Sequence, residues 1–216
     1  MPNILYLHGF ASGPLSTKGR FFHSRFEVIG GVVQHPQLDE GDFSSLTITK
    51  QLAVIDRAVQ ECKPALLMGS SLGGYLAALY AARHPDLAPA LVLLAPAFGF
   101  PRRWSEQLGD EAMAAWRQKG AREVYHYGER RMMPVGYALY EDGLKYEEYP
   151  EVTQPALVFH GRYDEVVDPA LSVQFAWGKP NVRLELLESD HQLLDVLEAI
   201  WETVAPFYQN LEPQRV

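Results

Sequence analysis

The chain has 216 residues, of which 47% are hydrophobic and 21% charged, a balance typical of a folded globular protein that argues against disorder. Twenty-seven acidic residues against 19 basic ones give a formal net charge of −8, which disfavours binding to nucleic-acid phosphates. The length fits one ordinary domain, and the single cysteine, Cys62, cannot form an internal disulfide, which favours a reducing compartment.

Short apolar runs alternate with longer helical patterns along the chain. Most of the apolar runs are continuous, as in parallel strands that are covered on both faces. Such alternation predicts an α/β fold with a doubly wound, mostly parallel sheet. The expected strands are residues 4–7, 28–33, 65–68, 90–94, 156–159 and 182–187. The expected helices are residues 46–62, 72–83, 170–177 and 193–208.

One stretch interrupts this alternation after the strand at 90–94. Residues 98–149 hold ten of the 25 aromatic residues, and the stretch is too long for a bare loop in a compact domain. We expect residues 98–150 to form a helical cap or lid inserted into a single domain that spans 1–216. The alternative is a helical excursion that uses its aromatic residues only to pack on itself. Flat rings and flexible methionines line apolar pockets well, and the predicted substrate-binding residues are therefore Phe98, Trp104, Met132 and Met133.

The strongest motif is Gly-Ser-Ser-Leu-Gly at residues 69–73. It follows a predicted strand and opens a predicted helix, which is the setting of a nucleophile elbow. Ser71 occupies the central position, with a glycine two residues before it and another two residues after it. Ser70 does not fit, because Met68 would then stand in the first glycine position. Ser71 is therefore the candidate nucleophile; the alternative is an ordinary glycine-rich turn that caps a helix.

A serine hydroxyl needs a base to take its proton. His191 lies between the last predicted strand and the last predicted helix, which places it at the carboxyl edge of the sheet beside Ser71. A third group should orient the imidazole. Asp164 follows the predicted strand 156–159, and the chain order serine, aspartate, histidine is the one expected for this kind of fold. Glu165 and Asp168 remain alternatives in the same loop.

The tetrahedral intermediate also needs hydrogen-bond donors for its oxyanion. The backbone N–H of Leu72 lies next to the nucleophile, at a helix N-terminus that favours negative charge. The backbone N–H of Phe10 follows the first strand, where Gly9 permits the turn that aims it inward. These two N–H groups are the predicted oxyanion hole; the alternative for the second is a simple tight turn.

Together these motifs resemble the α/β-hydrolase superfamily, and more narrowly the small bacterial YqiA-like esterases. The resemblance rests on Leu-Tyr-Leu-His-Gly-Phe at residues 5–10, the elbow at 69–73, His-Gly-Arg-Tyr-Asp at 160–164 and Ser-Asp-His at 189–191. It covers nearly the whole chain. It implies a serine hydrolase with Ser71, Asp164 and His191 as the triad, on an α/β-hydrolase fold that lacks the usual N-terminal antiparallel hairpin.

The predicted function is therefore hydrolysis of a small-molecule carboxylic ester through an acyl-enzyme. The nearest alternative is a thioesterase; a C–C bond hydrolase, a peptidase or a non-catalytic binding protein on the same fold are more remote. No metal or cofactor is expected, because metal-ligand and dinucleotide motifs are absent from the sequence. Without a recognisable signal peptide or membrane span, we expect a cytoplasmic monomer or homodimer that binds neither nucleic acid nor membrane.

Overall fold

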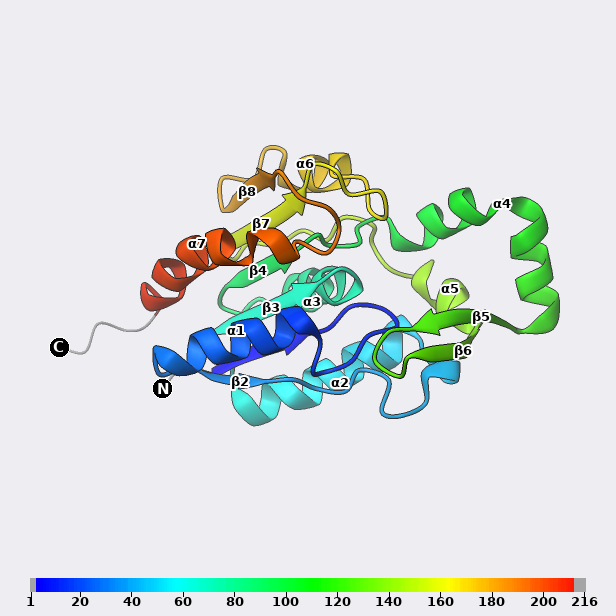
Figure 1. Cartoon of the computed structure of the whole chain (residues 1–216), viewed down its shortest axis with the longest axis horizontal. Helices are drawn as coiled ribbons and strands as arrows, with labels where there is room; N and C mark the ends of the chain where they lie inside the picture. The colour runs from blue at the N-terminus through cyan, green and yellow to red at the C-terminus, as the bar shows by residue number, and fades with distance from the viewer. Residues whose placement is uncertain (1–2, 212–216) are drawn as a thin grey trace.

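The computed structural model describes residues 3–211, and within them six strands form one central sheet of order β2-β1-β3-β4-β7-β8 (Figure 1). Every pairing between neighbouring strands of this sheet is parallel. The doubly wound parallel sheet predicted from the sequence is thus confirmed. The strands are β1 (Asn3–Leu7), β2 (Val32–Gln34), β3 (Leu66–Ser70), β4 (Leu91–Leu94), β7 (Ala156–Gly161) and β8 (Val182–Leu187).

Helices cover both faces of the sheet, and the side chains of each strand alternate between the two resulting cores. In β1, Leu5 and Leu7 pack into the core on one face, whereas Ile4 and Tyr6 pack into the core on the other. The first core is closed by α2 (Ile48–Cys62), α3 (Leu72–Arg83) and α6 (Ala170–Ala176). The second is closed by α1 (Thr17–Val28) and α7 (Leu197–Gln209). Burial on both faces explains why the strands read as continuous apolar runs.

Two predicted boundaries were wrong. The run 28–33 is not one strand, because Val28 ends α1 and the strand begins only at Val32. Helix α1 itself was not predicted, since few apolar side chains stand among its polar ones; its Ser16 cap, which accepts a hydrogen bond from the Gly19 N–H, is the signal that marks its start. The last helical segment is also divided, into a short 3₁₀ turn (η2, Leu194–Val196) followed by α7.

The segment inserted after β4 differs from the helical cap that the sequence predicted, because it contains an antiparallel hairpin. It consists of α4 (Phe100–Lys119), β5 (Ala121–His126), β6 (Arg131–Gly136) and α5 (Ala138–Gly143). Helix α4 is kinked at Gly109, whose φ of 72° lies in the left-handed region. Figure 1 shows this segment beyond the end of the sheet toward which the strands point.

Several contacts fix the inserted segment to the body of the protein, among them hydrogen bonds at α5 and at the tip of the hairpin. Asp142 of α5 accepts hydrogen bonds from the Thr49 N–H at 2.7 Å and from the Thr49 hydroxyl at 2.9 Å, at the start of α2. At the tip of the hairpin, the Tyr127 N–H donates to the Ala11 carbonyl at 2.7 Å, in the loop that follows β1. The insertion therefore borders the carboxyl edge of the sheet, where the candidate residues lie. No helix within residues 3–211 is both long and apolar enough to cross a membrane.

Candidate active site

Ser71 stands at the sharp turn between β3 and α3. Its backbone has φ 53° and ψ −119°, a combination that a residue with a side chain adopts only when its surroundings enforce it. The flanking glycines are required sterically. A Cβ at Gly69 would lie 2.3 Å from the Gly73 carbonyl oxygen, and a Cβ at Gly73 would lie 2.3 Å from the Leu7 carbonyl oxygen. The turn is thus pressed against the end of β1, and Ser71 is presented at the sheet edge.

Gly73→Ala is expected to lower the free energy of unfolding by about 2 kcal/mol or more, because its methyl group would collide with backbone rather than with a movable side chain. Urea unfolding measures this loss. Gly13→Ala is the control, since a Cβ at Gly13 has no atom within 4 Å. Equal stability of the two variants would contradict the close contact between the elbow and β1.

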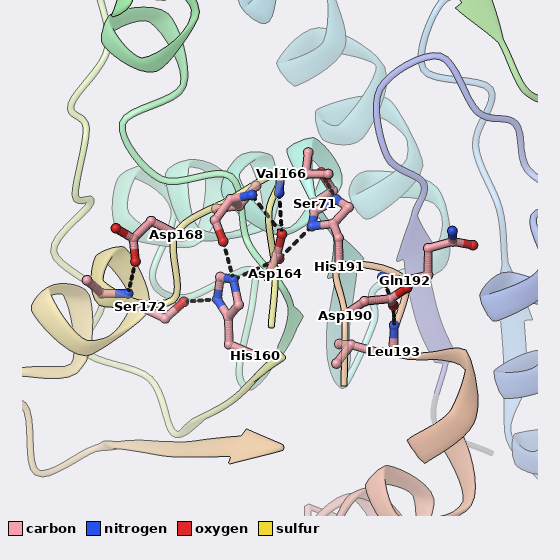
Figure 2. Close-up of polar contacts among 12 residues, drawn as sticks. Ser71, His160, Asp164, Val166, Asp168, Ser172, Asp190, His191, Gln192 and Leu193 are labelled. Atoms are coloured by element: carbon pink, nitrogen blue, oxygen red, sulfur yellow. Dashed lines mark hydrogen bonds and ion pairs between the residues drawn. The ribbon is translucent and has the colours of Figure 1, made fainter. Parts of the chain in front are cut away.

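His191 lies within hydrogen-bond distance of Ser71. Its Nε2 is 3.1 Å from the Ser71 Oγ, while its Nδ1 is 2.7 Å from Oδ2 of Asp164. The loop that carries His191 rests on the end of β7. A Cβ at Gly161 would lie 2.3 Å from the Ser189 carbonyl oxygen, so only glycine allows this approach. The structure therefore brings together the three residues that the sequence singled out (Figure 2).

Asp164 is held by four donors. Its Oδ1 accepts the Val166 and Val167 N–H groups at 2.8 and 2.7 Å. Its Oδ2 accepts the ring N–H groups of His191 and His160 at 2.7 and 3.0 Å. Burial favours the neutral acid, but these hydrogen bonds outweigh it and hold the pKa of Asp164 well below its usual range. Asp164 is therefore an ionised carboxylate at neutral pH, suited to stabilise a positive charge on His191.

Two other acidic residues near the site, Asp168 and Asp190, are engaged elsewhere. The carboxylate of Asp168 accepts the Ala170 N–H at 2.8 Å at the start of α6. That of Asp190 accepts the Gln192 N–H at 2.8 Å within its own loop. Glu165 has no hydrogen bond to His191 within residues 3–211. Asp164 is the acidic residue that the structure places against His191.

The two predicted oxyanion donors flank the serine. Leu72 begins α3, and its N–H precedes the hydrogen-bond ladder of that helix. Phe10 follows Gly9, where a Cβ would lie 3.3 Å from the Ser71 Cβ, so this loop passes directly beside the nucleophile. Within residues 3–211, neither the Phe10 nor the Leu72 N–H is engaged in a turn, loop or cap hydrogen bond. Both are thus available to an anion beside Ser71.

The four predicted substrate-binding residues occupy different environments. Trp104 of α4 is half-buried, and its ring meets that of Phe10 edge to face with centroids 5.1 Å apart. Phe98 is fully buried and stacks on Phe175 at 4.2 Å, so its ring has no surface for a substrate in this conformation. Met133 packs against the core, whereas Met132, on the opposite face of β6, is 54% exposed. Trp104 is the one that adjoins the candidate oxyanion loop.

One residue of the site, His160, was not predicted from the sequence to contact the catalytic residues. His160 is fully buried at the end of β7 and contacts Asp164. In the sequence, the residue shows only a position directly after the predicted strand 156–159, which does not indicate this contact. No cluster of metal-binding side chains occurs in the described part of the chain.

Comparison with known proteins agrees with this architecture. The model of the uncharacterised protein family UPF0227 matches residues 3–208. No curated protein matches the chain significantly.

Solved structures share the fold at low sequence identity. Alpha/beta hydrolase domain-containing protein 10 from mouse is 21% identical and superimposes with a TM-score of 0.82 over 98% of this chain and 91% of its own. Est1E from Butyrivibrio proteoclasticus is 22% identical, with a TM-score of 0.80 over 97% and 88%. A monoacylglycerol lipase from Paleococcus ferrophilus is 15% identical, with a TM-score of 0.78 over 97% and 95%. The fold is that of the α/β hydrolases.

Proposed function

The chain belongs to UPF0227, the family of the YqiA-like proteins, and from that premise we propose that it is a serine hydrolase that cleaves carboxylic esters through an acyl-serine intermediate. The observation that carries this proposal is the continuous relay from the Ser71 hydroxyl through His191 to the buried carboxylate of Asp164. The names of two similar structures, a monoacylglycerol lipase and a metagenome-derived lipolytic enzyme, support an ester as the substrate class.

The geometry supports the following sequence of steps. The Ser71 Oγ attacks the ester carbonyl carbon while His191 Nε2 takes its proton, and the carbonyl oxygen becomes an oxyanion that accepts the Phe10 and Leu72 N–H groups. The intermediate collapses with cleavage of the bond to the alcohol oxygen, and His191 returns the proton to that oxygen. Water then attacks the acyl-serine with His191 again as base, which releases the acid and restores Ser71. Asp164 stabilises the imidazolium in both halves.

A panel of p-nitrophenyl esters tests the proposal. Acetyl, butyryl and octanoyl esters vary the length of the acyl chain. An ester with an aromatic acyl group is included because ferulic acid is bound to Est1E in one similar structure. Matched acyl thioesters measure the preference for ester over thioester. Turnover of one or more esters by wild type is expected. Turnover of thioesters alone would replace the ester assignment, and no turnover of either would contradict the proposal.

We assign residues 98–150 the role of a cap over this site, with Trp104 as a wall of the acyl pocket because its ring contacts Phe10. Trp104→Ala is expected to raise KM about tenfold for the esters with an octanoyl or an aromatic acyl group. One aromatic wall of a pocket contributes on the order of 1–3 kcal/mol to the free energy of substrate binding. The acetyl ester should be less affected, because it does not reach the ring.

The control for this prediction is Trp177→Ala, which removes a tryptophan that is 83% exposed beside α6. Steady-state kinetics on the panel distinguish the two variants. An unchanged preference among chain lengths in Trp104→Ala would show that the ring does not line the acyl pocket.

A further inference from the structure

A second buried histidine touches the carboxylate of Asp164 from the side opposite His191. His160 Nε2 lies 3.0 Å from the Asp164 Oδ2 and 2.9 Å from the Val167 carbonyl oxygen. On the far side of the ring, Nδ1 lies 2.7 Å from the hydroxyl of Ser172 in α6. Figure 2 shows Asp164 between the two imidazoles, with Ser172 beside His160 on its left. The His160 ring has no exposed surface.

These contacts define where the protons are. A carboxylate and a backbone carbonyl can only accept hydrogen bonds, so the Nε2 of His160 must carry a hydrogen. In the neutral ring Nδ1 is then an acceptor, and the Ser172 hydroxyl donates to it. Ser172 thus stabilises the tautomer in which His160 donates to Asp164. In the same way, Asp164 stabilises the tautomer of His191 in which Nδ1 carries the hydrogen.

The catalytic carboxylate is consequently immobilised on all sides. Two backbone N–H groups hold Oδ1, and two imidazole N–H groups converge on Oδ2. Rotation of the carboxylate would break hydrogen bonds at both oxygens in a buried site, where an unpaired charged group is costly. The ring of His160 therefore fixes the direction in which Oδ2 meets His191.

We propose that His160, oriented by Ser172, is a positioning residue that aims the Asp164 carboxylate at His191 and sets the basicity of the pair. This inference rests on the proposed function for its catalytic consequence, because only a working relay needs a tuned base. His160 touches no reacting atom and acts through Asp164.

The proposal fixes the sign of a pH effect. The N–H of His160 withdraws negative charge from the same Oδ2 that faces His191. Without that donor, Asp164 would attract a proton more strongly and would also stabilise the protonated form of His191 more. The acid limb of the pH profile of kcat/KM reports protonation of His191, so the stronger stabilisation of its protonated form moves that limb to higher pH, while Asp164 itself stays ionised.

Other charged groups face this pair from the surrounding elements and must stay constant in the test. Lys18 of α1 and Arg103 of α4 both lie within electrostatic range of Asp164. Asp168 lies within electrostatic range of Arg103, and Asp190 lies within electrostatic range of Lys18. Burial lowers the pKa of Lys18 to about 8, against the opposing effect of Asp164 and Asp190. Its titration falls on the alkaline side and is separate from the acid limb. Variants at 160 and 172 leave all four groups in place.

The decisive variants are His160→Leu and His160→Gln. Leucine removes both ring nitrogens, whereas the amide nitrogen of glutamine is as many bonds from the backbone as Nε2 and can still donate to Asp164. In His160→Leu we expect the acid limb to rise by about one pH unit and kcat/KM at pH 7 to fall about tenfold to a hundredfold. His160→Gln should recover most of both. Ser172→Ala, a smaller change, should shift the limb in the same direction by less.

A second readout does not depend on turnover. Long-range proton–nitrogen NMR spectra of the histidine rings, assigned with His191→Gln, give the titration midpoint of His191 in each folded variant. A midpoint that rises in His160→Leu and returns in His160→Gln supports the proposal. A midpoint and acid limb that stay unchanged in His160→Leu and in Ser172→Ala, even with lower stability, would overturn it. Failure of wild type to cleave any ester would overturn the proposed function instead, while the midpoint still decides the role of His160.

Discussion

Ser71→Ala is expected to reduce kcat/KM for the best ester of the panel by about 10⁵-fold to 10⁶-fold, the loss found when the nucleophile of a serine hydrolase is removed. The change deletes a single oxygen atom, which lies 3.1 Å from His191 Nε2. Alanine has the same Cβ as serine, so the strained backbone at position 71 costs alanine no more than it costs serine. The fold should therefore persist, with residual activity from the oxyanion donors and substrate binding alone.

The matched control is Ser70→Ala, which tests the neighbouring serine of the same motif. Ser70 ends β3 with its side chain buried, and it has no contact with His191 in the described part of the chain. Its replacement should leave kcat/KM within about tenfold of wild type, since it removes no member of the relay. Activity that survived Ser71→Ala but not Ser70→Ala would reverse the assignment of the nucleophile.

Asp164→Asn is expected to cost about 10⁴-fold in kcat/KM. The two backbone N–H groups that hold Oδ1 would select the amide oxygen for that position, since only the oxygen can accept them. The amide NH₂ would then stand at the Oδ2 position, facing the N–H groups of both histidines. His191 would have to place its proton on Nε2 to avoid this clash of donors, and that tautomer cannot accept the proton of Ser71.

Asp168→Asn is the control for this prediction. Asp168 was an alternative for the third member of the triad in the same loop, but its carboxylate accepts a hydrogen bond from the Ala170 N–H at the start of α6. Its replacement should leave kcat/KM within about tenfold of wild type. A larger loss in Asp168→Asn than in Asp164→Asn, measured in single-turnover assays, would contradict the geometry of the relay.

The lowered pKa of Asp164 also links stability to pH. The group has a folded-state pKa below its unfolded value, so its contribution to stability is complete above the ordinary range of aspartate, near pH 4, and is lost as the pH falls further. Asp164→Asn should therefore flatten the acid dependence of the urea midpoint relative to wild type.

The parts of the site that the sequence predicted are those determined by chain topology. A glycine-flanked serine between a buried strand and a helix allows few backbone conformations. Gly69 and Gly73 are both required, because a Cβ at either position would lie less than 2.5 Å from a backbone carbonyl oxygen. Parallel strands bring their carboxyl ends to one edge, so loops far apart in the chain meet there. For that reason the placement of Asp164 and His191 beside Ser71 followed from their positions after strands.

The remaining features depend on tertiary contacts that carry no local signal. His160 directly follows the predicted strand 156–159, and its role appears only because α6 brings Ser172 to its other side. The strands of the β5–β6 hairpin have mostly half-buried or exposed side chains and no continuous apolar run, and the docking of the hairpin on Ala11 depends on the path of the whole insertion. Composition indicated an aromatic insertion, but it did not distinguish Trp104, which adjoins the site, from Phe98, which is buried.

Covalent labelling with a fluorophosphonate shows whether Ser71 is an activated nucleophile, because such reagents react with a serine that a base has activated and require no knowledge of the substrate. Intact-mass spectrometry of wild type and Ser71→Ala in parallel is the measurement. We expect one adduct on wild type, located on the peptide that contains Ser71, and none on the variant. No adduct on folded wild type, or an adduct that persists in Ser71→Ala, would contradict the assignment of Ser71 as the nucleophile.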